Sequence, residues 1–142
     1  MGRSRGGLTT KIHAVTDANG LPIRLTITPG QTHDVVPAGD LLAGLEEGQL
    51  VLGDKAYDAH WLRQKIVDQG ATPNIPNRAG KKQQSCFSAV LYKDRNLVER
   101  FFNKIKYFRR IATRYDKLGS SYLAMVKLAA IRIWLRFYES TA

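Results

Sequence analysis

Residues 91–117 read LYKDRNLVERFFNKIKYFRRIATRYDK and contain neither proline nor glycine. Apolar residues recur along this stretch at the three- and four-residue spacing of one helix face, at Leu91, Val98, Phe101, Phe102, Ile105 and Phe108. A pattern of this length predicts an amphipathic helix of several turns whose apolar face packs into the core. We expect the rest of the fold to be organised around this helix.

A polar stripe follows the margin of that apolar face. Its members lie at offsets of 0, 3, 7, 11 and 14 residues, at Tyr92, Arg95, Glu99, Asn103 and Lys106. At about 100° per residue, their directions fall within roughly 80° of one another. Glu99 is therefore an acidic side chain among cations. Two interpretations stay open: a surface ladder in which Arg95 pairs with Glu99, or a functional carboxylate beside anion-binding groups.

The chain as a whole is strongly basic. Its 142 residues carry a formal net charge of +10, and 44% of them are hydrophobic, which indicates a globular domain with a basic surface. Nine Lys or Arg and three Asp or Glu lie between Tyr92 and Lys117, so six of the ten net charges belong to this stretch. Such a concentration favours a polyanionic partner.

The sequence argues against several other classes of protein. Cys86 is the single cysteine, so no intrachain disulfide can form, and a reducing compartment fits. The cysteine and the three histidines lack the spacing of zinc ligands. We expect no signal peptide. The apolar stretch from Leu118 to Tyr138 contains three cations, so we expect a buried or dimer-facing helix rather than a membrane span.

The remaining elements are expected to alternate. Strands are predicted at Leu8–Thr16 and Pro22–Thr28, joined by a hairpin turn at Asp17–Gly20, and further strands at Gln49–Leu52, buried on both faces, and Ala71–Ile75. Helices are predicted from about Asp34 to Leu45, and from a cap at Asp58 to Asp68. Residues 1–7 are expected to form a basic loop, residues 8–117 the core and residues 118–142 a C-terminal helix. The polar segment 77–88 is expected to be a loop that contacts DNA.

Four segments resemble one family of enzymes, in that family's order: GRSRGGLTTKIHAVTDANG (2–20), TPGQTHD (28–34), LGDKAYD (52–58) and RNLVERFFNKIKYFRRIATRYDK (95–117). The spacing of Tyr92, Arg95, Glu99 and Lys106 resembles the signature around the last catalytic carboxylate of bacterial insertion-sequence transposases of the DDE superfamily. The nearest branch is the insertion-sequence family numbered five, related to that numbered four. The resemblance covers nearly the whole chain.

This resemblance implies an α/β fold of the ribonuclease-H-like, retroviral-integrase-like type, a mixed sheet with flanking helices. The predicted order of elements fits that fold without its first strand, so only two strands of its meander are expected. In the family, the missing strand carries the first of three catalytic carboxylates. Asp17 is expected to form the turn instead, and Asp34 to cap a helix or support the site.

By the same resemblance, Asp54 and Glu99 are the second and third catalytic carboxylates. They are also the implied ligands of Mg²⁺ or Mn²⁺, with two ions in the complete enzyme, because hard cations prefer carboxylate oxygens. Asp54 follows a predicted strand, which would fix its backbone at the sheet edge; a turn or helix cap is the structural alternative. We expect the two carboxylates to face one another across a cleft.

Double-stranded DNA, both transposon ends and target, is the implied partner. Its expected contacts are Tyr92, Arg95, Lys106, Arg109, Arg110 and Arg114. The complete enzyme is implied to be a homo-oligomer in the bacterial cytoplasm, associated with the nucleoid. An upstream reading-frame product or a fusion is implied to supply the first aspartate, so the chain alone is expected to be inactive. A non-catalytic DNA-binding remnant or regulator stays open as an alternative. A ribonuclease-H-like nuclease also stays open, although the Tyr-Arg-Glu-Lys spacing argues against it.

Overall fold

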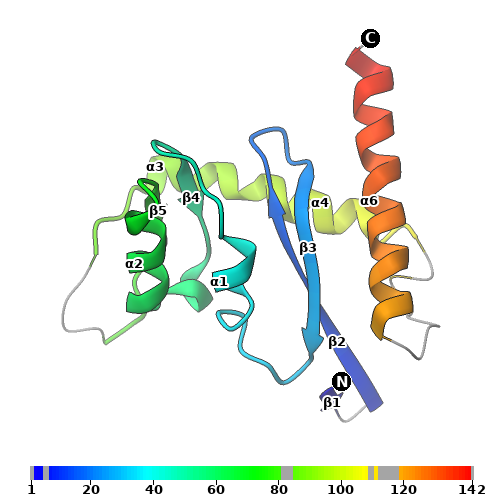
Figure 1. Cartoon of the computed structure of the whole chain (residues 1–142), viewed down its shortest axis with the longest axis horizontal. Helices are drawn as coiled ribbons and strands as arrows, with labels where there is room; N and C mark the ends of the chain where they lie inside the picture. The colour runs from blue at the N-terminus through cyan, green and yellow to red at the C-terminus, as the bar shows by residue number, and fades with distance from the viewer. Residues whose placement is uncertain (1, 5–6, 81–84, 109–110, 112–118, 142) are drawn as a thin grey trace. The chain divides into compact units, whose positions relative to one another are not determined.

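The computed structural model describes residues 2–4, 7–80, 85–108, 111 and 119–141 (Figure 1). The chain divides into two compact units. We call Met1–Gln31 with Asn96–Ala142 the terminal unit, and Thr32–Arg95 the middle unit. Each unit contains its own sheet. The single mixed sheet of a ribonuclease-H-like fold and a single core over residues 8–117 therefore stay predictions.

The terminal unit is built on an antiparallel hairpin of β2 (Gly7–Thr16) and β3 (Pro22–Pro29), as expected. Asp17 forms the turn: its Oδ1 accepts hydrogen bonds from Asn19 N and Leu21 N, both at 2.9 Å. Gly20 follows with a φ of 78°, a conformation that glycine adopts without strain. The prediction that Asp17 is a turn former is thus confirmed.

The far end of the hairpin contains a close approach of two backbones. Gly30 N donates to Thr9 O at 3.2 Å. A Cβ atom on Gly30 would overlap Thr9 Oγ1 and would lie 2.8 Å from Thr9 Cβ, so this position has no room for a side chain.

The expected loop at residues 1–7 is wrong for residues 2–4. These residues form β1 (Gly2–Ser4), which pairs antiparallel with β2, so that Gly2 lies opposite Thr9. The sheet has three strands, in the order β1-β2-β3, rather than two. Backbone pairing with β2 forms this short strand. Its residues are not typical of strands, so the sequence did not predict it. The strand consists of Gly, Arg and Ser, and therefore adds no carboxylate.

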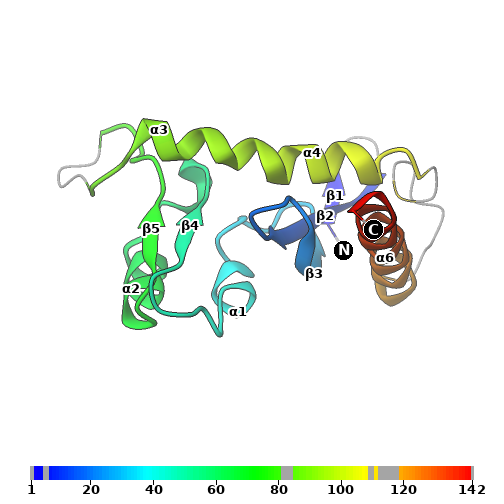
Figure 2. The same ribbon diagram turned by 90° about the horizontal axis from the view of Figure 1, so that it is seen from above.

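Among the described residues of the terminal unit, two helices cover the hairpin. In the terminal unit, α4 (Asn96–Ile105) lies against β2, and α6 (Gly119–Thr141) lies against β3 (Figures 1 and 2). Phe101, Ile105 and Val126 are fully buried between them. Trp134 Nε1 also donates to Pro22 O at 2.7 Å, which fixes α6 on the start of β3. The core-facing role predicted for the apolar side of the central stretch is confirmed for Phe101 and Ile105.

The predicted continuous helix from Leu91 is wrong in detail. The chain forms α3 (Ala89–Tyr92), a 3₁₀ turn η2 (Lys93–Arg95) and then α4. A 3₁₀ turn advances by about 120° per residue, so the angular arithmetic for the polar stripe fails between Tyr92 and Glu99. Glu99 and Asn103 still share one face of α4, whereas Leu91 is exposed rather than part of the apolar face.

The C-terminal helix is confirmed as α6, and only part of it is buried. Tyr122, Val126, Ala129 and Ile133 face the core, whereas Leu128, Ile131, Leu135 and Tyr138 are exposed. Across the described ranges, no helix combines the length and hydropathy needed to span a bilayer.

The middle unit pairs two short parallel strands, β4 (Leu50–Leu52) and β5 (Thr72–Asn74), with α2 (His60–Asp68) between them in sequence. Leu62, Ile66 and Ile75 form its buried centre. The helix expected from Asp34 to Leu45 is only the single turn α1 (Ala38–Leu41), because Pro37 precedes it and Gly44 with a φ of 80° follows. Burial of β4 on both faces was also a wrong expectation, since Leu50 is 42% exposed; a short apolar run does not distinguish one covered face from two.

Candidate active site

Asp54 lies two residues after β4, at the N-cap of the 3₁₀ turn η1 (Lys55–Tyr57). Its Oδ1 accepts a hydrogen bond from Ala56 N at 2.9 Å, and its Oδ2 accepts one from Arg95 Nη2 at 3.2 Å. The Asp54 side chain is 35% exposed and that of Arg95 is 24% exposed. Asp54 therefore caps a helical turn, which was the structural alternative to a catalytic role. It also contacts Arg95, a second predicted site residue.

Arg95 is held in an aromatic environment. Its guanidinium carbon lies 5.9 Å from the centroid of the Tyr92 ring, a cation–π distance. The Tyr92 ring in turn packs edge-on against Phe87, with 5.2 Å between ring centroids. Three predicted site residues of the middle unit, Asp54, Tyr92 and Arg95, are thus brought together.

Tyr57 belongs to the same site, and sequence reasoning missed it. Burial raises the pKa of the Tyr57 phenol to about 12, with further contributions from the negative charges of Asp34 and Asp54 and an opposing one from Arg95. Tyr57 therefore stays protonated at any physiological pH. Its place in the LGDKAYD segment was the available signal.

Asp34 was expected to cap a helix or to support the site. It does not cap α1, whose N-cap is Pro37 and has no side-chain cap bond. Its charge acts on Tyr57 together with that of Asp54. The two carboxylates therefore share one electrostatic environment around the phenol.

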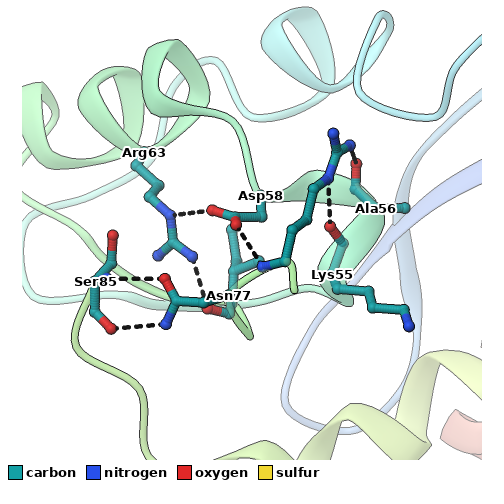
Figure 3. Close-up of polar contacts among 8 residues, drawn as sticks. Lys55, Ala56, Asp58, Arg63, Asn77 and Ser85 are labelled. Atoms are coloured by element: carbon teal, nitrogen blue, oxygen red, sulfur yellow. Dashed lines mark hydrogen bonds and ion pairs between the residues drawn. The ribbon is translucent and has the colours of Figure 1, made fainter. Parts of the chain in front are cut away.

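Asp58 was predicted to cap α2, and that prediction is wrong. The N-cap of α2 is Ala59, which makes no side-chain cap bond. Asp58 is instead buried: its Oδ1 accepts from Arg63 Nε at 2.9 Å, and its Oδ2 accepts from Arg78 N at 2.8 Å (Figure 3). Arg63 Nη2 also donates to Ile75 O at 2.7 Å. A buried charge needs a partner, and the sequence alone shows neither the burial of Asp58 nor its bond to the distant backbone of Arg78.

Arg78 braces the turn that Asp54 caps. Its Nε donates to Lys55 O at 3.3 Å, and its Nη2 donates to Ala56 O at 3.2 Å (Figure 3). The backbone of Arg78 is itself bound to Asp58. The segment after β5 therefore supports the loop between β4 and α2 from two directions.

The loop expected at residues 77–88 is closed at its base by two asparagines. Asn77 bonds to the backbone of Ser85 through both Nδ2 and Oδ1, at 2.9 and 2.8 Å (Figure 3). Asn74 does the same with Ser88, at 3.0 and 2.7 Å. Residues 81–84, between these closures, lie outside the described residues.

The other predicted site residues lie beyond the middle unit. Glu99 is exposed on α4, four residues after Arg95, and Lys106 is exposed just after that helix ends. Glu99 and Asp54 belong to different units, so their meeting across a cleft stays a prediction. Three predicted contacts with DNA lie outside the described residues: Arg109, Arg110 and Arg114.

The carboxylates have the donor chemistry of a magnesium site, but they do not form a complete one. Within residues 2–4, 7–80, 85–108, 111 and 119–141, no group of three His, Cys, Asp or Glu side chains is placed to hold a metal ion. One oxygen of Asp54 is already bound to the Arg95 guanidinium. A cation at Asp54 would have to share that carboxylate or displace the arginine.

Comparison with known proteins gives matches along nearly the entire chain. Residues 2–134 match the family model described as a transposase DDE domain. A putative transposase for insertion sequence element IS6501 of Brucella ovis is 43% identical over 130 residues, which cover 91% of this chain and 100% of that protein.

Two further relatives are longer than the matched region. A putative transposase for insertion sequence element IS402 of Burkholderia cepacia is 30% identical, over 92% of this chain and 64% of its own length. A transposase for insertion sequence element IS1106 of Neisseria meningitidis serogroup B is 27% identical, over 84% of this chain and 41% of its own length. No solved structure matches.

The raised pKa of Tyr57 predicts a stability change at high pH. Below pH 10, the phenol is protonated in both the folded and the unfolded chain. Between pH 10 and about 12 the unfolded chain loses this proton first, so the free energy of unfolding falls as pH rises. Denaturant titrations at intervals across this range should show a smaller fall for Tyr57→Phe than for the wild type. Identical pH profiles for the two proteins would contradict the assignment.

The buried Asp58–Arg63 pair predicts a large loss of stability when one partner is removed. Asp58→Ala should lower the free energy of unfolding by about 3–5 kcal/mol, because Arg63 would stay buried without its counter-charge. Adding Arg63→Met should restore part of this loss. Asp68→Ala is the matched control: Asp68 is exposed at the end of α2, and its loss should cost no more than about 0.5 kcal/mol. Equal losses for Asp58→Ala and Asp68→Ala would rule out the structural role.

Proposed function

The chain belongs to the transposase DDE domain family, and on this premise we propose that it is the part of a DNA transposase that carries the second and third catalytic carboxylates, Asp54 and Glu99. DNA transposition is supported by the family and by the names of all three relatives. The family's chemistry is nuclease and strand-transfer chemistry on DNA. A ribonuclease-H-like fold, and membership of the insertion-sequence family numbered five, form part of the proposal.

The hydrogen bond between Asp54 and Arg95 carries this proposal. These residues are 41 positions apart and come from two separate motifs, LGDKAYD and the Tyr-Arg-Glu-Lys signature. Four residues after Arg95 comes Glu99. The contact supports the view that both motifs serve one site, because unrelated surface motifs would have no reason to meet.

Asp54 and Glu99 would hold Mg²⁺ or Mn²⁺, two ions in the complete enzyme. These ions supply activation of the attacking oxygen and stabilisation of the leaving oxygen. Until DNA binds, Arg95 offsets the charge of Asp54. When a phosphate is present, Arg95 can donate to it instead, and Tyr92 keeps the guanidinium in place. Lys106, Arg109, Arg110 and Arg114 would bind the DNA backbone around the scissile bond.

A third carboxylate would complete the centre. Two metal ions a few ångströms apart repel one another strongly unless anionic ligands offset their charge. We propose that a segment from an upstream reading frame or a fusion supplies this aspartate. The matched region is 64% of the Burkholderia protein and 41% of the Neisseria protein, whereas it is the whole of the Brucella protein. We also propose that the complete enzyme is a homo-oligomer.

A non-catalytic DNA-binding regulator of transposition is the second candidate. It is supported by the net charge of +10, which fits binding to a polyanion and requires no carboxylate chemistry. Such a protein would keep the basic surface without the chemistry. The two candidates differ in one measurable property, metal-dependent strand cleavage.

Strand cleavage tests the catalytic assignment. The chain alone should not cleave a terminal-repeat duplex with Mg²⁺, whereas a protein extended by the upstream segment should. Asp54→Asn or Glu99→Gln in the extended protein should reduce cleavage to background while DNA binding persists, because each removes a charged metal ligand. Asp94→Asn is the control, since Asp94 is an exposed acidic residue of η2 that lies between Asp54 and Glu99 in the sequence. Full activity of Glu99→Gln would refute the assignment, and an inactive extended protein would favour the regulator.

The excess of positive charge between Tyr92 and Lys117 predicts salt-dependent binding to duplex DNA. Replacing Arg109, Arg110 and Arg114 with glutamine should flatten the slope of log affinity against log salt by up to about three units, because each phosphate contact releases counterions. The matched control removes three exposed cations elsewhere, Arg24, Arg100 and Lys127. Binding that is independent of salt, or an equal change in slope for both variants, would contradict the assignment.

A further inference from the structure

A groove of about 520 Å³ lies in the terminal unit, between the end of α4 and the C-terminal half of α6. Its described lining includes three cations, Lys104, Arg132 and Arg136, and three aromatic rings, Tyr107, Phe108 and Phe137. Among the described residues that line the groove, none is acidic. The described residues that line the groove all belong to the terminal unit, whereas Asp54 belongs to the middle unit.

The walls of the groove are fixed by the core. On one side, Ile105 anchors the end of α4, because its side chain is almost fully buried. On the other, the indole of Trp134 holds α6 through its bond to Pro22 O at 2.7 Å. Leu21 and Ile133 form the buried apolar part of the lining. A ligand would therefore meet a surface that is already formed, and binding would cost little ordering of the chain.

Lys104, Arg132 and Arg136 place three positive charges around one groove. Arg132 and Arg136 are four residues apart, so they project from the same face of α6, and Lys104 faces the groove from α4. Among the described residues, none forms a side-chain ion pair with any of the three. Like charges gathered around one groove repel one another, and a bound anion would relieve that repulsion.

The exposed ring of Tyr107 suggests that the ligand carries a flat aromatic group as well as a negative charge. Its ring is 88% exposed at the rim of the cationic groove. Exposed aromatic rings beside cations are the usual combination for single-stranded nucleic acid, because an unpaired base can stack on the ring while phosphates meet the cations. Bases inside a duplex are stacked on one another and cannot offer a free face.

We propose that this groove binds one or two nucleotides of single-stranded DNA. The phosphates lie against Lys104, Arg132 and Arg136, and a base stacks on Tyr107. The volume of the groove falls within the range of roughly 300–1,000 Å³ typical of small-ligand sites. The site needs no metal and no catalytic carboxylate, so it can exist whether or not the chain takes part in strand cleavage.

Fluorescence anisotropy with a labelled oligothymidylate, in buffer without divalent cations, tests the cationic part. The double variant Arg132→Gln/Arg136→Gln should weaken binding at least tenfold at low salt, and it should flatten the salt slope by about one unit or slightly more. The matched control, Arg100→Gln/Lys127→Gln, removes two exposed cations from α4 and α6 that do not line the groove. An equal loss in the control would overturn the site in favour of a general charge effect.

The aromatic part has its own test. Tyr107→Leu should weaken oligothymidylate binding by about five- to a hundredfold, whereas Tyr107→Phe keeps the stacking surface and should bind like the wild type. Tyr138→Leu is the control, because Tyr138 is exposed on α6 outside the groove lining. Circular dichroism of each variant checks that the helices are retained. Tyr107→Leu binding as tightly as the wild type would overturn the proposal.

Two competitors identify the ligand class. A duplex of equal length should compete less well than the single strand, and its affinity should not depend on Tyr107. Polyglutamate should compete only weakly. Equal dependence of duplex binding on Tyr107, or stronger competition by polyglutamate, would overturn the assignment to single strands. Oligothymidylate binding is measured without divalent cations and strand cleavage with Mg²⁺, so failure of this site and failure of the catalytic assignment give different results.

Discussion

The carboxylate of Asp58 has no exposed side-chain surface, and a charge in that position is stable only if its oxygens find donors. It finds them in Arg63 and in the backbone of Arg78, and Arg63 reaches on to Ile75 O. One buried charge thereby joins the turn η1, the helix α2 and the segment after β5. These bonds also support the loop that contains Asp54, because the Arg78 side chain donates to the carbonyls of Lys55 and Ala56. The position of Asp54 therefore depends on a residue four positions further along the chain.

The two aspartates of the LGDKAYD segment consequently have different physical tasks. Asp58 is enclosed, and both of its carboxylate oxygens accept hydrogen bonds from within the same unit. Asp54 is partly exposed, and one of its two bonds goes to the guanidinium of Arg95, which is itself partly exposed. The protonated Tyr57 lies close to Asp54 and Asp34 without adding negative charge to the cluster. In the proposed site for cations and phosphates, the buried Asp58–Arg63 pair would support a carboxylate that stays accessible to a ligand.

The sequence predicted the elements that depend mainly on neighbouring residues. The Asp17–Gly20 turn, the strands on either side of it and the extent of α6 follow from turn residues and periodicity, and all three are confirmed. Two other features depend on contacts between distant residues: the bond from Arg78 N to the buried Asp58, and the inclusion of Tyr57 in the site with Asp34 and Arg95. The pairing of β1 with β2 is local, but its Gly, Arg and Ser side chains show no strand pattern. The 3₁₀ turn at Lys93–Arg95 was missed for another reason, because its residues are compatible with an α-helix. Arg95 was chosen from a motif, yet only the structure supplies its contact with Asp54.

The contact between Thr9 and Gly30 restricts the order in which this hairpin can change during evolution. A side chain at position 30 collides with the Thr9 hydroxyl, and a Cβ at position 9 is by itself too close, at 2.8 Å. One of the two positions must therefore be glycine for as long as the backbones keep this pairing. A lineage could move the glycine from position 30 to position 9 only through an intermediate with glycine at both. That intermediate would lose strand stability, since glycine gives up more conformational freedom than other residues on folding. The two positions are thus epistatic, and sequence change at one is conditional on the history of the other.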